Sequence, residues 1–246
     1  MNITILLFLV TTVCFQGQTI QSQSYAREDH TSEIAALLRS MTPIRSKDVV
    51  KAPSSETRRN AEARLRQIAE QSDQERAEVI EALIKVVRDP EAKREWPIAH
   101  RWILAVDLLG YLRATEAIGV LISNLDHTGE NGITSSLNFA PVKTALVNIG
   151  KVAVPDLIQA FISDEEEIRF EAVHTLAGIG KPALRSLVEA LSSNQPLIKV
   201  GAARAVSFIG GKDAMQALAH AIEIEKEEQV RRQLQDALTE LERRSR

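Results

Sequence analysis

Two stretches of the sequence decide the fold: residues 168–180, IRFEAVHTLAGIG, and residues 198–210, IKVGAARAVSFIG. The second repeats the first at an interval of 30 residues, with Ile, a basic residue, Ala, an aliphatic residue and Ile-Gly in matching places. A third Ile-Gly stands 30 residues earlier, at Ile149-Gly150. Self-similarity at a fixed period of this length is typical of repeat proteins, in which each repeat is one supersecondary unit.

Each unit continues into a second apolar pattern with the i, i+3, i+4 spacing of an amphipathic helix. The first copy holds Val154, Leu157, Ile158 and Phe161, and the next holds Leu184, Leu187, Val188 and Leu191. Each unit is therefore predicted to be two helices joined by a turn near the Ile-Gly. Weaker copies upstream and a terminal half unit give about five and a half helix pairs over residues 56–246. One such pair cannot bury its apolar face alone, so the pairs are expected to stack.

The pattern resembles the HEAT repeat family, in the short form that is similar to phycobilisome-lyase-type repeats. The turn residue Asp164 with Ile168-Arg169, and Asn194 with Ile198-Lys199, look like the family's turn Asp followed by Val-Arg. The resemblance implies an all-α fold: a right-handed α-solenoid of stacked helical hairpins, an armadillo-type superhelix. It also implies an intrarepeat polar ladder made by these turn and basic residues.

The apolar run over residues 3–15 contains thirteen residues, too few to span a bilayer, and suits a secretory signal peptide. We expect residues 1–24 to be the signal, with cleavage near Ser22-Gln23-Ser24 and a mature N-terminus between residues 17 and 26. The mature protein would be extracytoplasmic, periplasmic or secreted, with no stable membrane span. It would contain no cysteine, because Cys14 is the only one in the chain. The alternative is a buried N-terminal helix or strand.

Residues 25–55 are expected to be a partly disordered N-terminal segment with one short helix. Thr31-Ser32-Glu33 can cap a helix that carries Ile34, Leu37 and Leu38. The stretch that holds Pro43, Lys47, Asp48, Pro53, Ser54 and Ser55 is typical of a linker. Two insertions interrupt the array, at residues 89–97 and 126–136, and each is either a tolerated surface loop or a functional one.

Composition excludes several classes of function. The chain has 30 basic and 33 acidic residues, a formal net charge of −3, and aromatics make up 4% of it. A nucleic-acid partner is therefore not predicted. The single cysteine cannot form an intramolecular disulfide or build a thiolate metal site alone.

The strongest chemical motif is Glu171-x-x-His174, whose i, i+3 spacing puts both side chains on one face of a helix. Di-iron carboxylate bundles use this motif in at least two copies, and here it occurs once. The residues matching His174 in other units are all polar, so that column is expected to face solvent: Asp107, Thr144, Arg204 and Asp236. We predict no metal, no cofactor and no catalytic residue.

Among HEAT-type proteins, deoxyhypusine hydroxylase binds iron through adjacent His-Glu dyads. This sequence has no adjacent His-Glu pair, and its five histidines are scattered. The resemblance to bilin lyases likewise covers only the repeats. An enzyme or enzyme subunit of either kind, oxidoreductase or lyase, remains the alternative function.

Two acidic stretches are either solvated turns or an acidic rim for a basic partner: Asp164–Glu167, and the edge made by Glu223, Glu225, Glu227 and Glu228. In the HEAT family the second helix of each unit lines the concave side. The outward positions of the second helices repeat neither a charge nor an aromatic residue, which favours a non-repetitive protein surface as the partner. The predicted protein-binding residues on this face are Lys85, Gln159, Arg185, Glu189, Gln216 and His220. The predicted function is an exported, non-catalytic scaffold or assembly factor; a structural module without a dedicated partner is a further possibility.

Overall fold

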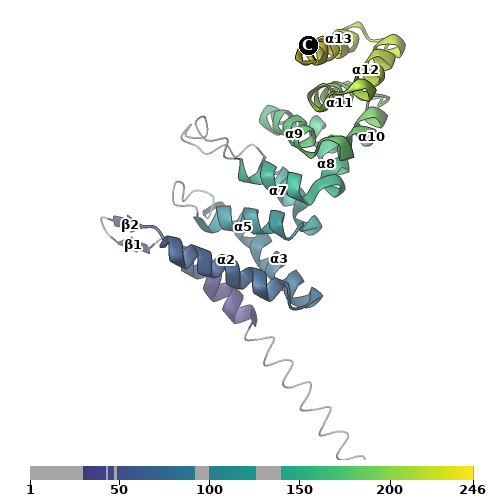
Figure 1. Ribbon diagram of the computed structural model, residues 1–246. Coiled ribbons are helices and arrows are strands. Elements are labelled where there is room, and N and C mark those ends of the chain that lie inside the picture. Colours follow the sequence, from purple (N-terminus) through teal and green to yellow (C-terminus); the bar gives the residue numbers. More distant parts are fainter. Residues whose placement is uncertain (1–29, 43, 47–48, 92–99, 126–139, 246) are drawn as a thin grey trace, which may run out of the picture. The chain divides into compact units, whose positions relative to one another are not determined.

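The computed structural model describes residues 30–42, 44–46, 49–91, 100–125 and 140–245 (Figure 1). The predicted signal peptide, Cys14, the insertion at 126–136 and most of the insertion at 89–97 lie outside these residues. The chain forms two compact units, one up to Ala82 and one from Leu83 onward. The boundary falls within helix α3, Asp73–Arg88.

The first unit contains a helix over residues 30–40, helix α2 (Ser55–Ala69) and the first part of α3. The helix over residues 30–40 buries Ile34 and Leu38 and is followed by the buried Met41. Thr31–Glu33 do not cap this helix as expected, because residue 30 already lies within it. Capping is instead clear at α3, where Glu75 N donates to Ser72 Oγ at 3.2 Å and Ser72 Oγ donates to the Glu75 carboxylate. This reciprocal pair satisfies an otherwise unpaired N–H of the first turn.

A short β-hairpin occupies part of the stretch that the sequence predicts to be a linker. Strands β1 (Ile44–Ser46) and β2 (Val49–Lys51) pair antiparallel, with Arg45 opposite Val50. The β-branched residues Ile44, Val49 and Val50 favour extended backbone, which the linker interpretation overlooked. Ser54 then caps α2, since its Oγ accepts from Thr57 N at 3.0 Å.

The second unit is a series of helical hairpins, which confirms the predicted all-α, solenoid-type fold. First helices alternate with second helices. In chain order the elements are α5 (His100–Tyr111), η1 (Thr115–Ala117), α6 (Ile118–Ile122), α7 (Pro141–Ile149), η3 (Gly150–Ala153), α8 (Val154–Gln159), η4 (Ala160–Ile162), α9 (Glu166–Ile179), α10 (Lys181–Ala190), α11 (Pro196–Ile209), α12 (Lys212–Ile224) and α13 (Glu228–Arg244). Short 3₁₀ turns flank two of the second helices, α6 and α8.

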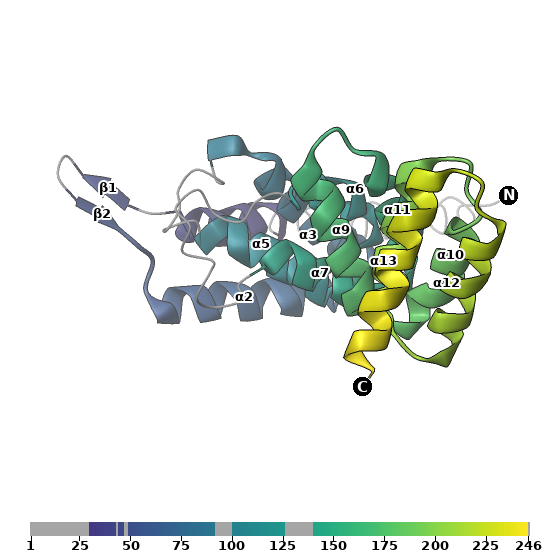
Figure 2. The same ribbon diagram turned by 90° about the horizontal axis from the view of Figure 1, so that it is seen from above.

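The hairpins stack so that their helices form two rows. Figure 1 shows α7, α9, α11 and α13 beside α8, α10 and α12, and Figure 2 shows the same helices from above. Helices α5, α7, α9, α11 and α13 each pack on the next and form the first-helix row. Helices α6, α8, α10 and α12 do the same and form the second-helix row. The core lies between the rows, and it includes the repeated positions Leu146, Leu176 and Val206, all fully buried. Each hairpin therefore buries its apolar face against its neighbours, as stacking requires.

The repeated Ile-Gly marks the end of three first helices, α7, α9 and α11. Gly150, Gly180 and Gly210 have φ angles of 80°, 73° and 74°. A residue without Cβ adopts such angles at little cost, whereas other residues are strained there. The N–H of each glycine donates to the carbonyl four residues earlier, which closes the last turn before the chain reverses.

Two close approaches fix the stacking distance between hairpins. A Cβ placed on Gly201 of α11 would lie 2.5–2.8 Å from three ring atoms of Phe161, and the Phe161 ring is fully buried. A Cβ placed on Gly110 of α5 would lie 2.6 Å from Ala145 Cα of α7. At both places the neighbouring residue packs directly on backbone.

The stretch Pro141–Ile162 is long and apolar enough to cross a membrane by length and composition alone. In this structure half of its apolar window is buried, and it comprises α7, η3, α8 and η4. Gly150 turns the chain within it, so its two halves belong to the two different rows. The apolar character of this stretch is explained by the core that it helps to build.

The polar ladder differs from the one that the resemblance implies. Arg169 donates to the backbone carbonyls of Ser163 and Asp164, at 2.7 and 3.1 Å, rather than to the Asp164 carboxylate. Lys199 reaches forward to the next unit and bonds to the Glu225 carboxylate. Each basic residue therefore binds a turn between two helices. Arg169 binds backbone carbonyls of its turn, and Lys199 binds the carboxylate of Glu225 in the turn of the next unit.

Candidate functional site

The six predicted protein-binding residues are all exposed. They lie on α3 and on three helices of the second-helix row, α8, α10 and α12: Lys85, Gln159, Arg185, Glu189, Gln216 and His220. Within this set Arg185 Nε lies 3.2 Å from Glu189 Oε1, and the two side chains are 87% and 66% exposed. Because α8 packs on α10 and α10 on α12, five of the six residues stand on adjacent helices.

The six side chains of this face are polar and exposed. An ion pair as exposed as Arg185–Glu189 contributes about 0.3–0.5 kcal/mol to the helix. Both charges are therefore available to a partner at little cost to folding. That these residues bind a protein stays a prediction.

Glu171 and His174 contact different neighbours. Lys143 Nζ lies 3.4 Å from a carboxylate oxygen of Glu171. The His174 ring instead lies between two phenylalanine rings, 4.4 Å from the Phe170 centroid and 4.9 Å from the Phe208 centroid. Burial by these neighbours is the main reason that the pKa of His174 is lowered, so its imidazole is neutral at pH 7. Within the described ranges, no group of three or more His, Cys, Asp or Glu side chains is arranged to hold a metal ion.

The prediction that the His174 column faces solvent is correct for its other members and wrong for His174 itself. The matching residues Asp107, Thr144, Arg204 and Asp236 are exposed, whereas His174 is half-buried. The difference arises because His174 contacts Phe208 of the neighbouring helix, which lies one turn beyond its counterpart Arg204.

A row of aromatic side chains on the first helices was missed by the sequence reasoning. Phe170 of α9 and Phe208 of α11 are 56% and 36% exposed, and His174 lies between them. The guanidinium of Arg244, at the end of α13, stands 5.2 Å from the Phe208 centroid. We call Phe170, His174 and Phe208 the aromatic row. One signal was available, because Phe170 and His174 are spaced i, i+4 in a chain with few aromatics.

The two acidic stretches differ in the structure. Asp164–Glu167 are exposed at the start of α9. In the other stretch Glu225 is buried, and its carboxylate accepts from Lys199 Nζ and from the N–H groups of Lys226 and Glu227. The hydrogen bond from the Lys199 side chain is the main reason that the pKa of the Glu225 carboxyl is lowered. Glu225 is therefore a structural residue that joins two units, whereas Glu223, Glu227 and Glu228 are exposed.

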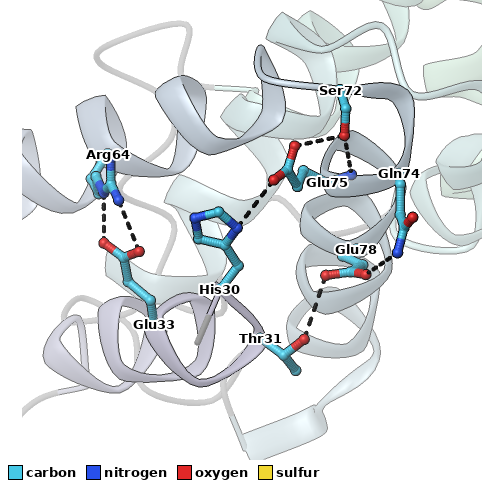
Figure 3. Close-up of polar contacts among 8 residues, drawn as sticks. All are labelled: His30, Thr31, Glu33, Arg64, Ser72, Gln74, Glu75 and Glu78. Atoms are coloured by element: carbon cyan, nitrogen blue, oxygen red, sulfur yellow. Dashed lines mark hydrogen bonds and ion pairs between the residues drawn. The ribbon is translucent and has the colours of Figure 1, made fainter. Parts of the chain in front are cut away.

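The first unit has its own polar contacts, drawn in Figure 3. The helix over residues 30–40 is bonded to α2 and α3 by three pairs: His30 Nδ1 lies 3.1 Å from Glu75 Oε1, Thr31 donates to Glu78, and Glu33 accepts from Arg64. The last pair is bidentate, with N···O distances of 2.5 and 2.9 Å, and the Arg64 guanidinium lowers the pKa of the Glu33 carboxyl. These contacts fix a helix in place, and each acid is engaged by a partner.

A sequence model for HEAT repeats matches residues 154–239, which run from α8 into α13. The resemblance to HEAT repeats is thus confirmed over these residues. No curated protein matches the chain. Two crystal structures described as engineered proteins of the Northeast Structural Genomics Consortium are similar to it. The first is 21% identical in sequence; the match spans 86% of this chain and 97% of the engineered protein, with a TM-score of 0.34. The second is 20% identical in sequence; the match spans 85% of this chain and 58% of the engineered protein, with a TM-score of 0.32.

Proposed function

We propose that this chain, which carries HEAT repeats over residues 154–239, is an exported, non-catalytic scaffold that binds a protein through its second-helix row. The observation that carries the proposal is the exposure of all six predicted residues, most of them on adjacent helices of that row. Stacked hairpins supply a firm support for such a face, because each second helix is packed on its neighbours.

A protein is the favoured partner because the exposed groups are varied. Arg185, Glu189, Gln216 and His220 offer a cation, an anion, an amide and an imidazole within two helices. A repetitive polymer is matched by a repeated contact residue, and no such repetition occurs among these four positions. A folded protein surface offers the varied complementary groups that this face needs.

The non-catalytic part of the proposal is supported by the contacts of the strongest chemical motif. Glu171 is ion-paired with Lys143, and His174 packs between two phenylalanine rings. The export part is supported by the apolar run over residues 3–15, which has the length of a signal-peptide core.

Capture from the native cell envelope tests the binding part. The bait is the purified chain, and the test variant exchanges the exposed charges, Arg185→Glu with Glu189→Arg. The matched control exchanges another exposed i, i+4 pair, Glu228→Arg with Arg232→Glu. We expect the test variant to lose the captured partner and to keep the wild-type melting temperature, while the control retains the partner. Equal capture by all three proteins would reject this face.

Two further measurements test the remaining parts. The mass of the protein isolated from its native cells should place the mature N-terminus between residues 17 and 26 in the extracytoplasmic fraction. Full-length protein beginning at Met1 in the cytosol would contradict export. Stoichiometric iron or zinc in the wild-type protein, lost in His174→Ala, would overturn the scaffold and favour the enzyme alternative.

A further inference from the structure

The aromatic row lies on the first helices and therefore belongs to a different surface from the second-helix row. On α9, Glu166, Phe170 and His174 follow at i, i+4 and i+8, which places a carboxylate, a phenyl ring and an imidazole along one face. Phe208 continues the row on α11. Phe170 is 56% exposed although it contacts His174, so most of its ring is accessible to another molecule.

The row already binds one guanidinium within the chain. Arg244 lies 5.2 Å from the centroid of Phe208, inside the range of a cation–π contact. That contact covers the Phe208 end of the row. Among the described residues, no cation lies over the ring of Phe170, so the other end of the row is open.

The charge around the open end is negative. Glu166 and Glu167 precede Phe170 by four and three residues, so both are its neighbours on the helix surface. Both are exposed, as are Asp164 and Glu165, and no cation of the described residues bonds to these four carboxylates. Arg169 is directed at the turn carbonyls instead. An exposed ring beside uncompensated carboxylates is complementary to a cationic side chain with an apolar stem.

We propose that Phe170, together with Glu166 and Glu167, forms a docking surface for a basic segment of a partner protein. An Arg or Lys of that segment covers the Phe170 ring as Arg244 covers Phe208, and its charge pairs with the two carboxylates. This surface goes beyond the proposed function, because it lies on the first-helix row and shares no residue with the second-helix face.

The test measures binding of a fluorescein-labelled synthetic peptide in which Arg alternates with Leu, by fluorescence anisotropy in low salt. The same peptide with Glu in place of Arg is the peptide control. Phe170→Ser removes the ring, Phe170→Tyr keeps it, and Glu166→Gln with Glu167→Gln removes the charges. Asp213→Asn with Glu223→Gln is the matched control, because it removes two exposed carboxylates of α12 and changes the net charge equally.

We expect Phe170→Ser and the Glu166/Glu167 variant each to weaken binding of the Arg peptide about two- to fivefold, the size of one exposed cation–π or ion-pair contact. Phe170→Tyr and the Asp213/Glu223 variant should bind as the wild type does. Equal loss in both carboxylate variants, or no loss in Phe170→Ser, would overturn the proposal, as would equal binding of the Glu peptide. The Arg185/Glu189 exchange should leave peptide binding unchanged. The docking surface at Phe170 and the second-helix face are therefore tested independently of each other.

Discussion

Replacing Gly201 by alanine tests how closely the hairpins stack. Gly201 lies in the middle of α11, where alanine would stabilise an isolated helix by about 1 kcal/mol. In this structure the new Cβ would stand 2.5–2.8 Å from three atoms of the Phe161 ring. That ring is fully buried, so it has no solvent-filled space into which to move.

The two effects have opposite signs, and the clash is the larger. Ordinary carbon–carbon contacts are about 3.5–4.0 Å, so the ring or the helix must shift by roughly 1 Å. Overpacking of this kind costs about 1–3 kcal/mol in a well-packed core. After subtraction of the gain in helix propensity, we therefore expect Gly201→Ala to lower the free energy of unfolding by up to about 2 kcal/mol.

Urea titration followed by far-UV circular dichroism measures this change. Gly119→Ala is the matched control, since Gly119 is exposed in α6 and a Cβ there meets nothing within 4 Å. That variant should be unchanged or more stable by up to about 1 kcal/mol. Combining Gly201→Ala with Phe161→Leu should recover part of the loss, because the smaller side chain frees the space. A Gly201→Ala protein that is as stable as the Gly119→Ala protein would refute direct packing of Phe161 on α11.

Three further predictions concern the array and its turns. Deleting residues 227–246 removes α13 and uncovers the buried Leu218. We expect a lower melting temperature, aggregation, and a loss of helical circular dichroism signal larger than the deleted helix accounts for. An unchanged melting temperature would count against stacking. Gly180→Ala should cost about 1–3 kcal/mol in urea titration, because φ is 73° with ψ of −139° there; no loss would contradict the turn geometry. Glu225→Gln should destabilise the protein by about 1–2 kcal/mol at pH 7. Folding lowers the pKa of the Glu225 carboxyl, so its ionised form stabilises the folded protein. This stabilisation is present above the unfolded pKa of about 4.3 and is lost as the pH falls through the folded pKa. The melting temperatures of the wild type and of Glu225→Gln should therefore converge in acid.

The hairpin array could be predicted because its turns leave a direct mark on the sequence. Helices α7, α9 and α11 each end in backbone that glycine adopts most easily, so Gly150, Gly180 and Gly210 recur at a fixed interval. The buried positions recur with them, since Ala172 and Ala202 occupy equivalent places between packed helices. Local geometry and periodicity therefore agree, and the fold follows from both.

The aromatic row could not be found by aligning repeats. Alignment pairs His174 with Arg204, but in space His174 meets Phe208, because neighbouring helices are offset along their axes. The contact at Glu225 was missed for a similar reason, since its partner Lys199 lies 26 residues earlier in another unit. Contacts between units depend on that offset, which a single sequence does not specify.

Site-specific photo-cross-linking from the second-helix row is the most direct test of protein binding by this chain. A photoreactive phenylalanine analogue replaces Gln216 on α12, and the same analogue at Thr144 on α7 serves as the control, because both positions are exposed but lie in different rows. Irradiation of the cells that produce the protein should give a discrete protein adduct from position 216 that is absent from position 144. No adduct from position 216, or the same adducts from both positions, would contradict a binding role for the second-helix row.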